Sequence, residues 1–180
     1  MTGQRGRMRT RRPQRNPARR ILVVTEGTRT EPQYVERLNS YLRSRSATAI
    51  VKSVGVGEDP LRVVKKSIEL RDAATDTEKC YDVCVCLVDV DEHSTLESAS
   101  RLAERESILL LVSSLKFEAW LRWHAEDRRS ALNSSQLDQR MATLKLTTGK
   151  TLSLRFPIDG VEDACTIARA ADPAMRAGRT

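Results

Sequence analysis

The sequence predicts an α/β fold of the Rossmann-like type: a parallel sheet of about four strands, helices on both faces, and a small helical extension at the carboxyl end. Short apolar runs of strand length recur between residues 21 and 112. Each run is followed by a segment with apolar residues at helical spacing, and acids directly follow two of the runs. Runs this apolar on both faces are typical of strands buried inside a parallel sheet.

Each predicted strand is followed by a predicted helix. Strands are expected at residues 21–24, 49–54, 82–88 and 107–112. The segment Thr30–Gln33 has the residues of a capping box, a threonine followed three positions later by a glutamine, and predicts that a helix starts there. Further helices are expected after Asp59, after Ser94, along 117–124 and near 161–171. This alternation predicts parallel pairing of the strands.

The positive charge of the chain is concentrated at its amino terminus. The formal net charge is +7, but residues 1–20 hold eight arginines and no acid, and the rest has 23 basic against 24 acidic residues. We therefore predict a disordered arginine-rich tail over 1–19, a core over 20–125 and an extension packed on the core over 126–180. The tail is expected either to bind nucleic-acid phosphates or only to solubilise the protein. The arginines concerned are Arg5, Arg7, Arg9, Arg11, Arg12, Arg15, Arg19 and Arg20.

Composition argues against a membrane or secreted protein and against a zinc-binding protein. No apolar run of about 18 residues is present, and the amino terminus lacks the apolar stretch of a signal peptide, so we expect a cytoplasmic protein without membrane contact. The four cysteines and two histidines contain no C-x-x-C pair. Cys84 and Cys86 fall inside an apolar strand and are expected to be buried free thiols rather than zinc ligands.

Acids follow two of the predicted strands. Asp89 and Asp91 follow the run at 82–88, and Glu26 follows the run at 21–24. Strand residues two apart point the same way, and ligands in such sheets bind at the carboxyl ends of strands. Carboxylates held close together repel one another unless a cation is bound. The pattern therefore predicts a site for Mg²⁺, or for Mn²⁺.

Four blocks of the sequence, in this order and spacing, resemble the signature blocks of the RloB-like family. That family is a branch of the TOPRIM nucleases associated with restriction and phage-defence loci. The resemblance covers about residues 20–170 and implies a TOPRIM-like fold in which Glu26, Asp89 and Asp91 form one Mg²⁺-dependent site for phosphodiester chemistry. The blocks are residues 23–32, 54–60, 88–93 and 113–124.

The fourth block departs from the family pattern S-N-P-x-F-E-x-W at two positions. Its serine, phenylalanine, glutamate and tryptophan match, whereas Ser114 and Leu115 stand where the family has asparagine and proline. We expect this departure to change the loop before the following helix.

Three of four accessory candidates have a simpler structural explanation. Glu92 is either an added metal ligand or a solvent-exposed neighbour, and His93 either contacts metal or phosphate or fixes the following turn. Glu118 matches a signature position but also stands four residues before Arg122, where an ordinary helical ion pair would account for it. Only the resemblance suggests that Lys150 contacts a phosphate.

Two further motifs are interpreted as structural. His124 shares a helical face with two aromatic residues and is expected to be a partnered core histidine. Gly55 and Gly57 lack the frame of a phosphate-binding loop and are expected to supply turns.

These features favour a metal-dependent nuclease that hydrolyses DNA or RNA in bacterial phage defence, with the arginine tail recruiting nucleic acid. The alternative is a catalytically weak TOPRIM-fold module that binds nucleic acid or acts in an assembly with an AAA-type ATPase. The resemblance implies such a partner, because an ATPase is commonly paired with this family. A phosphoacceptor domain of the receiver type also places acids at strand ends, but the lysine and threonine that it needs on later strands are not identifiable.

Overall fold

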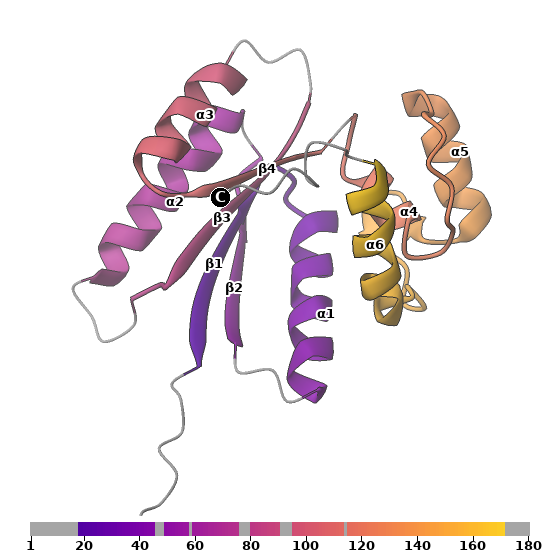
Figure 1. Ribbon diagram of the computed structural model, residues 1–180, viewed down its shortest axis with the longest axis horizontal. Helices are drawn as coiled ribbons and strands as arrows, with labels where there is room; N and C mark the ends of the chain where they lie inside the picture. Colours follow the sequence, from indigo (N-terminus) through magenta and orange to yellow (C-terminus); the bar gives the residue numbers. More distant parts are fainter. Residues whose placement is uncertain are drawn as a thin grey trace, which may run out of the picture.

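A four-stranded parallel sheet forms the centre of the protein in the computed structural model, which describes residues 18–45, 49–57, 59–75, 80–90, 95–113 and 115–171. The strands lie in the order β2-β1-β3-β4 (Figure 1). All four predicted strands are present, and all pairs are parallel, as predicted. Their bounds are β1 (Arg19–Thr25), β2 (Ala49–Gly55), β3 (Val83–Asp89) and β4 (Leu109–Ser113).

Helices cover both faces of this sheet, which confirms the predicted fold class. Helix α1 (Thr30–Ser44) lies on one face, and α2 (Pro60–Thr75) and α3 (Leu96–Arg105) lie on the other (Figure 1). Side chains of β1 alternate between two cores, as expected of a strand buried on both faces. Leu22 and Val24 pack with residues of α2 and α3, whereas Val23 packs with Tyr34 of α1.

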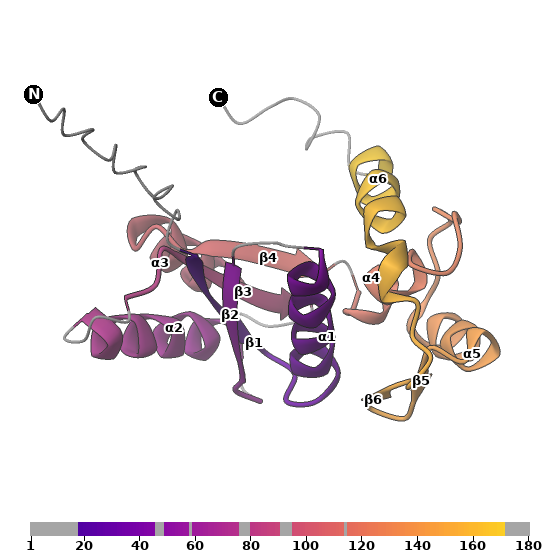
Figure 2. The same cartoon turned by 90° about the horizontal axis from the view of Figure 1, so that it is seen from below.

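The chain beyond β4 forms an extension on the α1 side of the molecule, away from α2 and α3 (Figure 2). A helix was predicted at 161–171, and α6 is found there; α5 and the two short strands lie in a region where the sequence predicted no element. The second core joins this extension to α1, because Phe117, Leu137 and Phe156 pack with Tyr34. The elements are α4 (Glu118–Arg122), α5 (Ser134–Leu144), β5 (Thr147–Thr148), β6 (Thr151–Leu152), the 3₁₀ turn η1 (Ile158–Gly160) and α6 (Val161–Ala171).

The start of α1 differs from the predicted capping box. The helix begins at Thr30 itself, and its N-cap residue, Arg29, makes no side-chain capping bond. The hydroxyl of Thr30 instead donates to the carbonyl of Lys150 at 3.0 Å. The carboxamide oxygen of Gln33 accepts from the N–H of Leu152 at 2.8 Å. The polar side chains that the pattern assigned to the helix end therefore bind the β5–β6 hairpin.

Two of the tail arginines lie in β1. Arg19 pairs with Ala49, so the strand begins at the last residue of the predicted tail. The N–H of Arg20 donates to Asp82, and its guanidinium lies 5.8 Å from the centre of the Tyr81 ring. Both arginines lie at the amino end of the sheet, about 20 Å of strand away from its carboxyl edge. The other six arginines, at positions 5 to 15, lie outside the described residues.

Cys84 and Cys86 are buried free thiols, as predicted, whereas Cys80 is exposed. None of the described helices combines the length and the hydropathy that crossing a bilayer requires.

Candidate active site

The strand order creates a crevice between β1 and β3. From β1 the chain passes through α1 to β2 on one side, and from β3 it passes through α3 to β4 on the other. Where connections diverge in this way, a crevice opens at the carboxyl ends of the two central strands, and ligands of open α/β sheets bind there. Glu26 directly follows β1 and Asp89 ends β3, so the structure brings these two predicted acids to that crevice.

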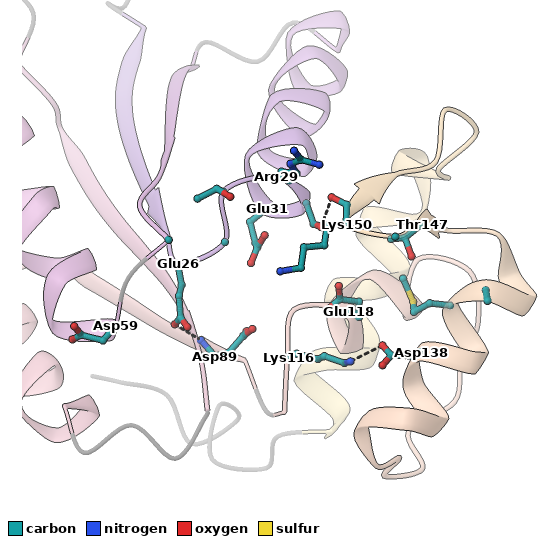
Figure 3. Close-up of a pocket in the computed structure, with 17 residues that line it drawn as sticks. Glu26, Arg29, Glu31, Asp59, Asp89, Lys116, Glu118, Asp138, Thr147 and Lys150 are labelled. Atoms are coloured by element: carbon teal, nitrogen blue, oxygen red, sulfur yellow. Dashed lines mark hydrogen bonds and ion pairs between the residues drawn. The ribbon is translucent and has the colours of Figure 1, made fainter.

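Glu26 is fixed by hydrogen bonds to both neighbouring strands. Its N–H donates to the carbonyl of Leu87 at 2.9 Å, and its carbonyl accepts from the N–H of Gly57 at 2.7 Å. Its carboxylate accepts from the N–H of Asp89 at 3.3 Å (Figure 3). The Glu26 side chain is thus tied to the end of β3.

A cavity of about 810 Å³ opens at this edge, between the sheet and the extension (Figure 3). One wall is acidic and belongs to the β1–α1 loop, the first turn of α1, β3 and α4. The opposite wall is formed by α5 and the β5–β6 hairpin. The acidic wall holds Glu26, Glu31, Asp89 and Glu118, and the other wall includes Asp138, Met141, Thr147 and Lys150.

The carboxylates of the acidic wall act on one another. Burial, followed by the negative charges of the three glutamates, raises the pKa of Asp89 to about 7, against the lowering effect of a hydrogen bond with Ser113. Burial also raises the pKa of Glu31, and the charges of Glu118 and Glu26 contribute. Both shifts are therefore due first to burial and then to the negative charges of the neighbouring carboxylates.

Glu31 was not predicted as a site residue. It lies in the first turn of α1, where an acid is ordinarily explained by the helix dipole, and this explanation concealed its place in the site. Backbone hydrogen bonds from Glu31 itself and from Gly27 lower the pKa of its carboxyl but do not offset burial. The sequence did contain a signal for Glu31. A helix that follows a central strand starts at the same sheet edge as the ligand crevice, so an acid in its first turn lies near that crevice.

Two of the accessory candidates, Glu118 and Lys150, line the cavity. Arg122, the alternative partner for Glu118, instead lies 3.7 Å from Glu126, so the predicted helical ion pair is wrong. Lys150 points from the hairpin into the cavity, toward Glu31 (Figure 3). Lys116 also lines the cavity, but its ammonium group is paired with Asp138.

Three predicted site residues, Asp91, Glu92 and His93, lie outside the described residues. His124 is buried, and its Nε2 atom lies 3.1 Å from the hydroxyl of Tyr34, which confirms its prediction as a core histidine.

The acidic wall suits a hard divalent cation by its chemistry. Mg²⁺ and Mn²⁺ prefer carboxylate oxygens, and a bound cation would relieve the repulsion that raises the pKa of Asp89. Within the described ranges, no three acidic, histidine or cysteine side chains are gathered closely enough to hold a metal unaided. Glu26 and Asp89 are the described side chains best placed to begin such a site, with Glu31 and Glu118 beside them.

Comparison with known families identifies the family of the chain. The sequence profile of RloB-like proteins matches residues 21–174. The chain belongs to the RloB-like family. Among curated proteins, none matches the chain significantly.

The four RloB-like signature blocks meet at the cavity, although they are far apart in the sequence. Residues 26–31 of the first block, Gly57 and Asp59 of the second, Asp89 of the third and Glu118 of the fourth all line it. The blocks that resemble the family are therefore the blocks that build this site.

The departure from the RloB-like pattern at Leu115 has a structural counterpart. Leu115 has a φ of 74°, a conformation that the ring of a proline cannot adopt. A proline at this position would therefore require a different backbone in the loop before α4. Ser114 lies outside the described residues.

Gly55 provides a test of how the loop between β1 and α1 is packed against the end of β2. A Cβ atom here would lie 2.6 Å from the carbonyl oxygen of Gly27 and from the Cα of Thr28, and these backbone atoms cannot move freely. We expect Gly55→Ala to lower the free energy of unfolding by about 1–3 kcal/mol, measured by urea denaturation. Gly27→Ala is the matched control, because the three atoms nearest to its Cβ would belong to the flexible carboxylate of Glu31 rather than to backbone. Equal losses for the two variants would contradict this account.

Proposed function

We propose that this protein is a metal-dependent nuclease that hydrolyses phosphodiester bonds of DNA or RNA with Mg²⁺ or Mn²⁺. The observation that carries the proposal is geometric: Glu26, Glu31, Asp89 and Glu118 line one cavity at the carboxyl ends of β1 and β3. Family membership supports it, because the RloB-like resemblance implies phosphodiester chemistry at these positions. On the same resemblance we place the activity in antiviral defence, and on the sequence composition we place it in the cytoplasm.

The chain's own residues divide the work as follows in this proposal. Asp89 and Asp91 hold the cation, and Asp91 is included from the sequence alone. Glu26 contacts the cation or moves a proton as general acid or base, because its carboxylate is held against the end of β3. Lys150 contacts a phosphate from the opposite wall. The bound cation would stabilise the charge that develops on the phosphate and activate a water molecule.

The decisive experiment is incubation of the purified protein with labelled single- and double-stranded DNA and RNA. We expect cleavage of at least one substrate with Mg²⁺ or Mn²⁺ and none with EDTA. Cleavage that EDTA leaves unchanged, or no cleavage of any substrate with either metal, would contradict the proposal.

A second candidate function is a nucleic-acid-binding or assembly module that acts with an AAA-type ATPase. The observation that favours it is the absence, among the described residues, of three side chains gathered around a metal position. This candidate predicts nucleic-acid binding without turnover in both metals, and an unchanged result when the ATPase is added to the cleavage assay.

The arginine tail is proposed to recruit nucleic acid. Deleting residues 1–17 removes six arginines and leaves β1 intact. We expect weaker binding and a flatter dependence of log K on log salt, by about 0.9 for each duplex DNA phosphate that the shortened protein no longer neutralises. Fluorescence anisotropy over a range of salt concentrations would measure both quantities. An unchanged slope would show that the tail only solubilises the protein.

A further inference from the structure

One face of α1 is bonded to the backbone of the β5–β6 hairpin. Thr30, Gln33 and Arg37 are spaced three and four residues apart, so they lie on the same face of the helix. Thr30 donates to the carbonyl of Lys150, and Gln33 accepts from the N–H of Leu152. Arg37 donates to the carbonyls of Leu152 and Ser153.

These bonds reach main-chain atoms rather than side chains. They fix where the hairpin backbone lies, whatever side chains the hairpin carries. Thr30 is buried and Arg37 is half-buried, so these bonds are partly shielded from competing water. Packing reinforces them, because Leu152 is buried in the same core as Tyr34.

The hairpin that is held in this way carries Lys150 into the cavity (Figure 3). Gly149, with a φ of 58°, forms the turn just before it. Of the two lysines that line the cavity, Lys116 is paired with Asp138, and Lys150 faces the acidic wall.

The same helix contributes to the acidic wall. Glu31 lies next to Thr30 in the first turn of α1 and lines the cavity on the acidic side. Helix α1 therefore carries one wall directly and holds the other through hydrogen bonds. The separation between Lys150 and the Glu31 carboxylate is therefore set by α1.

We infer that Thr30, Gln33 and Arg37 are positioning residues that hold the β5–β6 hairpin as a phosphate-binding wall, so that Lys150 faces a nucleic-acid phosphate across the cavity from the carboxylates. The identity of the ligand rests on the proposed function, whereas the bonds between helix and hairpin do not. A phosphodiester fits this space because its anionic oxygens suit an ammonium group on one side and a cation held by carboxylates on the other. Arg37 acts through Lys150 and does not touch the ligand.

A double-mutant cycle in the full-length protein tests this inference. The binding of a labelled single-stranded oligonucleotide is measured with Ca²⁺ for Lys150→Gln, Arg37→Ala and the double variant. We expect Lys150→Gln to weaken binding about tenfold, the usual effect of losing a charge-assisted hydrogen bond. Arg37→Ala should weaken binding in the wild-type background but cause no further loss in the Lys150→Gln background. Arg43→Ala alters an exposed residue of α1, and Lys145→Gln alters the exposed C-cap residue of α5, just before the hairpin; both should leave binding unchanged.

Equal losses for Arg37→Ala in both backgrounds would overturn the inference, because Arg37 would then contact the ligand itself. No loss for Lys150→Gln would also overturn it. If thermal unfolding shows that Arg37→Ala does not fold, Gln33→Ala, which removes a single hydrogen bond, is used in the same cycle. Cleavage with Mg²⁺ is assayed separately. Absence of cleavage with an intact binding cycle would refute the nuclease proposal and leave this inference standing.

Discussion

Replacing Asp89 with asparagine is expected to abolish metal-dependent cleavage and to stabilise the metal-free protein. Asparagine keeps the size of the side chain but removes a charge that is buried among three glutamates. Cleavage is lost because the amide is a much poorer ligand for a hard cation. The free energy of unfolding should rise by about 1–2 kcal/mol at neutral pH, because a charge is no longer buried there and repulsion within the acidic wall decreases.

The stability gain should depend on pH in a defined direction. The pKa of Asp89 is raised from 3.8 to about 7, so the folded protein holds this proton more tightly than the unfolded chain does. Asp89 therefore costs nothing below both values and progressively destabilises the fold as the pH rises through this interval. The advantage of Asp89→Asn should be small at about pH 4 and largest above pH 7.

Urea denaturation in EDTA over this pH range, beside the cleavage assay, would measure both effects of Asp89→Asn. Asp127→Asn is the matched control, since Asp127 is an exposed acid 3.4 Å from Arg129. It should show neither the pH-dependent gain nor the loss of cleavage. Persistent cleavage by Asp89→Asn would remove this residue from the proposed metal site.

The central sheet was predictable because its strands are short, apolar on both faces and separated by helical patterns. The run at 82–88 became β3 almost residue for residue, and α6 was found at the predicted residues. The hairpin was not predictable, because β5 and β6 are two residues each and have no periodicity to detect. Helix α5 did leave a signal, because Asn133 and Gln136 have the spacing of a capping box and form one in the structure.

The site was partly predictable for a related reason. Glu26 and Asp89 follow strands directly, and topology alone takes the ends of β1 and β3 to one crevice. Glu31 was missed and Glu118 was left undecided, because each is an ordinary first-turn acid unless its tertiary neighbours are known. The bonds of Thr30 and Gln33 to the hairpin join residues about 120 positions apart. A local pattern such as a capping box cannot reveal contacts of that range.

Glu26→Gln is expected to lower the cleavage rate by about 10² or more while leaving the fold and nucleic-acid binding intact. The backbone of Glu26 is held by its bonds to Leu87 and Gly57, which the substitution does not touch. The glutamine oxygen retains the ability to accept from the N–H of Asp89. What is lost is the negative charge that a metal contact or a proton transfer requires.

Single-turnover cleavage with saturating protein would separate this loss of rate from any change in affinity. Glu104→Gln, which alters an exposed acid on α3, provides a control with the same chemical change outside the cavity. Loss of cleavage confined to Glu26→Gln, with unchanged oligonucleotide affinity in Ca²⁺, would place the carboxylate in the chemical step. A rate close to that of the wild type would mean that the Glu26 charge does no chemistry, since the hydrogen bond to Asp89 survives in the variant. The search for the proton-transfer group would then move to Glu31 and Glu118, the other glutamates of the acidic wall.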